Sequence, residues 1–251
     1  MNAFRLKLVG AVCMALSVAS TTVVPALLGA PSADNMGSLT AAVLCEAVSW
    51  TAIPIYAWLL VEGSRVTCHA GAYLGRLVAL AAVCEVPYDL VASGMAFDPR
   101  SQNPVWGLAI ALAVLMLLDW AARRYAGASG RAARWALSAL IVVAGLLWNL
   151  LLGVGVRQRV MFVGVATLLF ALVFRFLRAR ENTMMLTAGL LGAVLCVTPA
   201  VGVAVLHYRD DRVGGDAGAG RRPWRTRWAW YAVYPALLLA GAALTALTPL
   251  G

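Results

Sequence analysis

The sequence carries little charge. Only 12% of its 251 residues are Asp, Glu, Lys or Arg, whereas 62% are hydrophobic. An ordinary soluble domain carries about a quarter charged residues, so these proportions exclude one, and they equally exclude a disordered chain. Lysine is almost missing, because Lys7 is the single lysine among 20 basic residues. With a mean hydropathy of +0.83, the class that remains is an integral membrane protein whose outer surface is covered by lipid.

Histidine and cysteine are also scarce. His69 and His207 are the two histidines, and the five cysteines include no Cys-x-x-Cys pair. Such a set predicts neither a metal site nor a structural disulfide. The net charge of +9 comes from arginines between apolar segments. Because no basic run is interleaved with stacking aromatic residues, we expect no nucleic-acid partner.

Apolar segments long enough to cross a bilayer repeat along the whole chain. A membrane-spanning helix needs about 20 apolar residues. The pattern predicts an all-α fold, a polytopic membrane helix bundle of about eight transmembrane helices in one integral membrane domain over residues 1–251. The segments run approximately over 8–29, 39–61, 73–93, 105–122, 135–155, 159–177, 183–206 and 228–250.

The first segment has an alternative interpretation as a cleaved signal peptide. Arg5 and Lys7 precede it, and Gly-Ala-Pro-Ser-Ala at 29–33 resembles a cleavage region. The uncharged stretch from Leu8 to Ala33 is longer than a usual signal core, which favours a retained helix.

The basic residues predict the orientation, since they concentrate on the cytoplasmic side of membrane proteins. With a cytoplasmic N-terminus, alternation places eleven basic residues inside and three, Arg100, Arg157 and Arg159, outside. This predicts a multi-pass protein of the inner (cytoplasmic) membrane. A Gly-rich loop at about 208–227 breaks the rule, because its six arginines fall outside. Either this loop is translocated, or the count of crossings after residue 134 is wrong.

Five carboxylates lie within or at the ends of the apolar segments. Charges in a bilayer are costly, so they usually face the interior of the bundle and mark function. Glu85 and Asp89 are four residues apart and share one helix face, which suits proton transfer. The alternative is that the charged groups neutralise one another as structural pairs, for example Arg76 with Glu62. The five are Glu46, Glu62, Glu85, Asp89 and Asp119.

A series of short motifs occupies residues 50–104. They are Pro54-Ile55-Tyr56, Glu62-Gly63, Thr67, Tyr73-Leu74-Gly75-Arg76-Leu77, Glu85-Val86-Pro87-Tyr88-Asp89 and Asn103. In order and spacing they resemble the TraX family, conjugal-transfer membrane proteins associated with pilin acetylation. Trp230-Tyr231-Ala232-Val233-Tyr234-Pro235 resembles the last helix of that family.

This resemblance implies a membrane acetyltransferase. Such an enzyme moves an acetyl group from acetyl-CoA to a protein N-terminus, as in a pilin, or to another acceptor. The resemblance makes Glu62, Glu85 and Asp89 the candidate catalytic residues, and Tyr73, Arg76, Asn103 and Tyr234 the candidate substrate-binding residues. The phosphates of acetyl-CoA need cationic contacts. Candidates for this role, which also serve as ordinary orientation signals, are Arg123, Arg124, Arg175 and Arg178.

The chain departs from the family pattern where the family carries histidines. Val18 and Leu237 stand at these two positions, in the first and last segments. Loss of a catalytic base removes orders of magnitude in rate. Three functions therefore stay open: a divergent acetyltransferase, a catalytically impaired membrane protein that binds a partner or lipid, and a small-solute transporter with a carboxylate proton relay. The absence of an inverted repeat disfavours the transporter.

Overall fold

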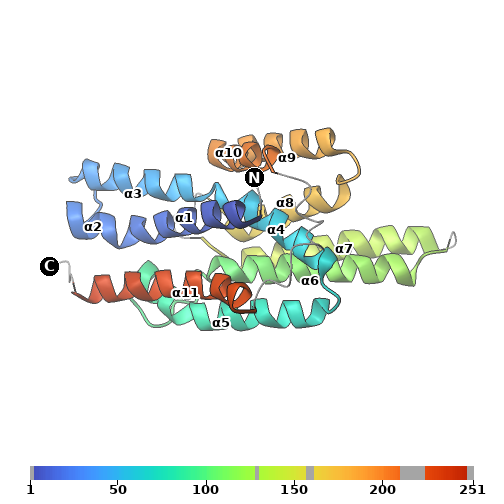
Figure 1. Ribbon diagram of the computed structural model, residues 1–251, viewed down its shortest axis with the longest axis horizontal. Coiled ribbons are helices and arrows are strands. Elements are labelled where there is room, and N and C mark those ends of the chain that lie inside the picture. The colour runs from blue at the N-terminus through green and yellow to red at the C-terminus, as the bar shows by residue number, and fades with distance from the viewer. Residues whose placement is uncertain (1–2, 128–129, 157–160, 210–223, 248–251) are drawn as a thin grey trace.

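The computed structural model describes residues 3–127, 130–156, 161–209 and 224–247. Within these ranges the regular structure is helical, which confirms the all-α fold class. The helices lie roughly along the long axis of the molecule (Figure 1). They are α1 (Ala3–Thr21), α2 (Val23–Leu28), α3 (Met36–Ser49), α4 (Ala52–Val66), α5 (Ala70–Ser93), α6 (Pro104–Arg124), α7 (Arg131–Leu151), α8 (Val163–Phe176), α9 (Glu181–Leu195), α10 (Val197–His207) and α11 (Trp224–Leu247).

Each predicted segment coincides with one helix or with two consecutive helices. Five stretches are long and apolar enough to cross a membrane, and α8 and α10 are apolar but shorter. The chain is therefore a multi-pass membrane protein. The five stretches are Phe4–Thr21, Met36–Val66, Pro104–Arg124, Arg131–Leu151 and Ala229–Leu247.

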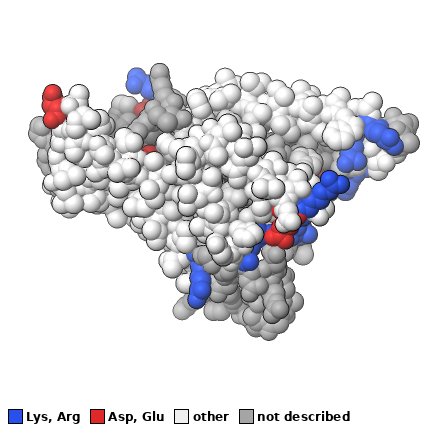
Figure 2. Space-filling model, turned by 90° about the horizontal axis from the view of Figure 1, so that it is seen from above, with Lys and Arg blue, Asp and Glu red and all other residues white. Residues whose placement is uncertain are grey.

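The outer surface of the bundle is apolar. On α9, Leu186, Leu190 and Val194 are 75%, 69% and 77% exposed at a spacing of four residues. An apolar stripe of this kind is unfavourable in water, so it is covered by lipid. Figure 2 shows a largely uncharged face, with most of its visible Lys and Arg side chains toward one end of the molecule.

Two apolar clusters hold the helices together. In the larger one, Leu112 of α6 and Phe174 of α8 are fully buried, and Phe174 makes an edge-to-face contact with Trp58 of α4 at 5.3 Å between ring centroids. The smaller cluster joins α1, α5, α6 and α11; Val18 is one of its buried members, and Leu237 packs against it. The two positions where the family pattern has histidines therefore lie in one apolar cluster.

The predicted segment 183–206 is a helical hairpin and not one continuous helix. The backbone at Cys196 is extended, with φ −178° and ψ 151°, and separates α9 from α10. The two helices pack closely because Gly192 has no side chain: a Cβ there would lie 2.6 Å from the Ala200 nitrogen. The Nη2 of Arg209 donates to Oε1 of Glu181 at 2.6 Å, so the end of α10 returns to the start of α9.

The hairpin accounts for the basic loop that broke the orientation rule. The rings of Phe4 and Trp230 meet at 5.5 Å, so the starts of α1 and α11 lie at one end of the bundle. Arg209 lies at this same end, on a shared cavity wall. Residues 210–223 of the loop lie outside the described residues. Both flanks of the loop lie at the end where α1 begins, so segment 183–206 starts and finishes at that end, as the alternative of a different count of crossings after residue 134 expects.

Candidate functional site

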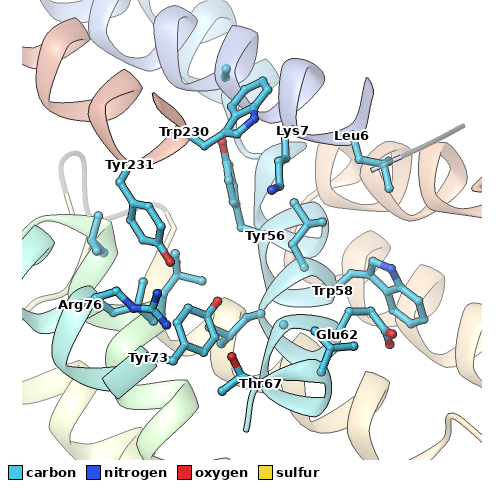
Figure 3. Close-up of a pocket in the computed structure, with 18 of the residues that line it drawn as sticks. Leu6, Lys7, Tyr56, Trp58, Glu62, Thr67, Tyr73, Arg76, Trp230 and Tyr231 are labelled. Carbon is cyan, nitrogen blue, oxygen red and sulfur yellow. The ribbon is translucent and has the colours of Figure 1, made fainter. Parts of the chain in front are cut away.

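A cavity of about 650 Å³ lies where the starts of α1, α5 and α11 meet the ends of α4, α8 and α10. Its volume is in the usual range of small-molecule sites. Figure 3 shows Tyr73, Arg76 and Tyr231 on one side of this cavity and Trp58 and Glu62 on the other.

The charged residues of the cavity wall are mainly cationic. Four basic side chains and two carboxylates line it, so this set has a formal charge of +2 (four minus two). A concave surface of one sign raises the local concentration of oppositely charged ligands. The arrangement therefore favours an anion. The basic residues are Lys7, Arg76, Arg178 and Arg209, and the acids are Glu62 and Glu181.

Glu62 is paired with Arg178. Its Oε2 accepts from Arg178 Nη2 at 3.2 Å and lies 3.6 Å from Arg65 Nη1. The sequence had suggested Arg76 as its structural partner, and this pairing is wrong. Two guanidinium groups therefore compensate the charge of Glu62.

The guanidinium groups of two arginines lie over the ring of Trp58. The centroid of its ring lies 4.3 Å from Cζ of Arg209 and 5.5 Å from Cζ of Arg178. Cation–π contacts of this kind strengthen when they are desolvated, and Trp58 is only 7% exposed. The tryptophan thus fixes two of the four cations relative to α4.

Glycines make room for the tyrosines of the cavity. A Cβ on Gly10 of α1 would lie 2.8 Å from the ring of Tyr56, and one on Gly63 would lie 3.3 Å from Oη of Tyr73. Tyr73 in turn lies beneath Arg76, with 5.8 Å between Cζ and the ring centroid. The Glu62-Gly63 motif therefore combines an ion-pair partner with the space that the next helix needs.

Of the eleven residues that the sequence singled out, five line the cavity. They come from α4, α5 and α11 and from the turn after α8, and they are Glu62, Tyr73, Arg76, Arg178 and Tyr234.

Glu85 and Asn103 lie elsewhere, at the junction of α5 and α6. Oε2 of Glu85 accepts from Trp106 Nε1 at 3.0 Å, from the Asn103 backbone nitrogen at 3.4 Å and from the Asn103 side-chain amide. Asn103 also donates to the Ala81 carbonyl at 2.8 Å and caps the start of α6 through Val105 N at 3.0 Å. These bonds hold the connection between the two helices.

Asp89 faces a different partner from Glu85, although both lie on one helix face. Its Oδ2 accepts from the backbone nitrogen of Asp98 at 2.9 Å, and its side chain is buried. The contact fixes the loop that follows α5. Glu85 and Asp89 therefore share neither a hydrogen-bond partner nor a place in the cavity wall.

Three of the arginines expected to bind acetyl-CoA are also outside the cavity. Arg175 forms an ion pair with Asp119, which joins α8 to α6. Arg123 and Arg124 are in the last turn of α6, and Arg124 lies over the ring of Tyr125 at 5.6 Å. Arg178 is the one of the four that reaches the cavity wall.

Sequence reasoning missed several lining residues. Lys7 and Trp230 come from the two ends of the chain and meet at 5.9 Å. Arg209 was assigned to the opposite side of the membrane, so its place could not be foreseen without the α9–α10 hairpin. Within the described ranges, no three His, Cys, Asp or Glu side chains come close enough together to hold a metal ion.

Comparison with known proteins gives one match. Residues 13–247 match the family model described as TraX protein. No curated protein and no solved structure gives a significant match.

Proposed function

The chain belongs to the TraX family, and we propose that it is an integral membrane acetyltransferase. In this proposal the cavity binds acetyl-CoA and presents its thioester to the amine of an acceptor. The family is associated with pilin N-acetylation, so a protein N-terminus, as in a pilin, is the proposed acceptor.

The observation that carries the proposal is the combination of cations and aromatic rings in one cavity. Acetyl-CoA offers phosphates and an adenine ring. Guanidinium groups bind phosphate through paired hydrogen bonds, and aromatic side chains stack on a base. Lys7, Arg76, Arg178 and Arg209 supply the cations, and Tyr73 and Trp230 are among the aromatic rings.

The reaction places simple demands on this cavity. The acceptor nitrogen attacks the thioester carbon, a C–N bond forms, and the C–S bond breaks. The amine loses a proton and the CoA thiolate gains one. Fixed cations stabilise the oxyanion that develops during the attack. Lys7 and Arg76 line the cavity without belonging to the Glu62–Arg178 pair, and we assign this electrostatic role to them and the phosphate contacts to Arg178 and Arg209.

The proposed orientation suits a cytosolic donor. The cavity lies at the end of the bundle where α1 starts and where most of the basic residues gather. Basic residues favour the cytoplasmic side of the inner membrane. We therefore infer that the cavity opens to the cytoplasm, where acetyl-CoA is available.

A second candidate is a protein that binds the donor without turnover. It is favoured by the apolar cluster that holds Val18 and Leu237, since neither residue can act as a base. Glu62, Glu85 and Asp89 also have structural partners. A small-solute transporter is supported by no comparable observation, because Glu85 and Asp89 do not line the cavity.

The test is calorimetry of acetyl-CoA binding to the protein in nanodiscs, with CoA and ATP as controls, followed by transfer of labelled acetyl to a peptide amine. Selective binding near 1 μM corresponds to about −8 kcal/mol. Binding with transfer supports the acetyltransferase, and binding without transfer supports the second candidate. No binding up to millimolar donor contradicts both. Proton-coupled uptake into proteoliposomes would support the transporter.

A further inference from the structure

The charged residues of the cavity lie at one end, and part of its apolar lining extends beyond them. The charged residues stand within about two turns of a helix end, or directly beyond it, as for Lys7, Glu62 and Arg76. Some uncharged lining residues, such as Tyr73 and Trp230, share this end. Others lie further along the helices or on α6, and this deeper set is Ala11, Met14, Leu80, Val105, Leu108, Val233 and Tyr234.

The apolar part is deep enough for more than an acetyl group. Met14 follows Lys7 by seven residues on α1, and Leu80 follows Tyr73 by seven residues on α5. At 1.5 Å per residue, each interval is about 10 Å. Val105 and Tyr234, which are 3% and 8% exposed, belong to its lining. A thioester that lies at the charged end and carries only an acetyl group would leave this depth unfilled.

The deeper part offers apolar contact and few polar groups. The hydroxyl of Tyr56 already donates to the sulfur of Met14 at 3.4 Å. Leu80 and Met14 pack against the buried cluster that includes Val105 and Tyr234. Such a lining gains free energy from a hydrocarbon chain and cannot satisfy a polar ligand.

We propose that the cavity binds an anionic amphiphile, with a phosphate-bearing head among Lys7, Arg76, Arg178 and Arg209. Its acyl chain runs between α1, α5, α6 and α11 toward Met14 and Leu108. For a CoA thioester this inference rests on the proposed function: the thioester, and not the phosphates, lies beside Lys7 and Arg76, because the pantetheine arm separates the two. The inference then names a medium-length acyl chain, longer than acetyl, as the preferred donor. The same chemistry also fits an alkyl phosphate or a lipid with a phosphate head.

The first experiment is a chain-length series of CoA thioesters. Acetyl-, butanoyl-, hexanoyl- and octanoyl-CoA and free CoA are titrated into the protein in nanodiscs, and the heat from empty nanodiscs is subtracted. Each methylene that enters an apolar site contributes up to about fourfold in affinity. We expect octanoyl-CoA to bind at least about a hundredfold more tightly than acetyl-CoA. Equal affinities across the series would overturn the proposal.

A blocked variant shows where the chain lies. Leu108→Trp fills the deep part and leaves the charged end intact, and Leu80→Phe is a second, milder change. Both should remove most of the octanoyl advantage while the affinity for free CoA stays the same. Leu117→Trp, at a position on α6 that is 48% exposed, is the matched control and should keep the advantage. The same loss in Leu117→Trp would overturn the assignment of the chain to this cavity.

Octyl phosphate separates this inference from the proposed function. If acetyl-CoA and octanoyl-CoA bind equally, the acetyltransferase proposal stands and the acyl-chain inference fails. If no CoA compound binds but octyl phosphate does, and Leu108→Trp abolishes its binding, the amphiphile site stands with a lipid-like source. If neither octanoyl-CoA nor octyl phosphate binds, the inference fails.

Discussion

Arg209 and Trp58 stack on one another, with 4.3 Å between the guanidinium carbon and the centroid of the indole ring. The side chain of Arg209 is only 7% exposed, and the same guanidinium donates to Glu181 at 2.6 Å. This contact fastens the end of the α9–α10 hairpin to α4. It therefore connects the topology of the bundle to the wall of the cavity.

Replacing Arg209 by lysine should weaken this connection. An ammonium group keeps the charge but loses the planar stacking and the paired donors. We expect Arg209→Lys to destabilise the protein by about 1–2 kcal/mol, measured as a lower midpoint of thermal unfolding in detergent. Arg180→Lys, at a neighbouring exposed position, is the control and should leave the midpoint unchanged. Equal midpoints for the two variants would contradict a structural role for the stack.

The stability of the hairpin should depend on Gly192 and not on Gly189. A Cβ at Gly192 would lie 2.6 Å from Ala200 N, whereas a Cβ at Gly189 would meet nothing within 4 Å. Gly192→Ala should therefore cost about 1–3 kcal/mol through overpacking. Gly189→Ala should be neutral or slightly stabilising, because alanine is the better helix former. Thermal unfolding of both variants checks this, and a neutral Gly192→Ala would mean that α9 and α10 are further apart.

Labelling of single cysteines should show the consequence of the hairpin for topology. In a cysteine-free background, Tyr208→Cys should react with an impermeant maleimide from the same side as Ala126→Cys. Asp34→Cys and Ala96→Cys should react from the opposite side. Simple alternation of eight crossings would instead place residue 208 with residue 34. Labelling of Tyr208→Cys together with Asp34→Cys would therefore reject the hairpin.

Glu85 should act on stability and not on donor binding. Glu85→Ala leaves the Trp106 indole and the amides of Asn103 without their acceptor. A buried donor that loses its partner costs about 1–3 kcal/mol, so we expect a loss of about 2–4 kcal/mol in thermal unfolding. Glu85→Gln keeps one carbonyl oxygen and should lose less than half as much. Both should bind acetyl-CoA like the parent protein. If Glu85→Gln abolished acetyl transfer at an unchanged midpoint, Glu85 would be catalytic.

The helices could be predicted because hydropathy acts locally. A run of about 20 apolar residues has few alternatives to a helix in a bilayer, so the eight segments were found. The break at Cys196 could not be found in this way. A single extended residue between two apolar helices does not change the mean hydropathy of the segment. Its effect depends on the close approach of Gly192 to Ala200 across the hairpin.

The site was predictable only in part for a related reason. Motif spacing placed Glu62, Tyr73 and Arg76 near one another because α4 and α5 are consecutive. It did not show that Arg178 would form an ion pair with Glu62. Nor did it show that Lys7 and Trp230, which are far apart in the sequence, would be in contact. Glu85 and Asp89 share a helix face, but their partners come from the loop after α5 and from the start of α6. Spacing on one helix does not reveal those partners.

An arginine should affect the affinity for the donor only if it lines the cavity. Arg76 lines the cavity beside Tyr73, whereas Arg123 is in the last turn of α6 and does not line it. Loss of a charge-assisted contact to the donor costs about 1.5–3 kcal/mol, so Arg76→Ala should weaken acetyl-CoA binding by about ten- to a hundredfold in calorimetry. Arg123→Ala removes the same charge from the same end of the bundle and should change the affinity by less than about twofold. This pair separates a specific contact from a general electrostatic attraction, because only the latter responds to both changes and weakens steeply with salt. Equal losses in the two variants would therefore contradict a specific contact between Arg76 and the donor.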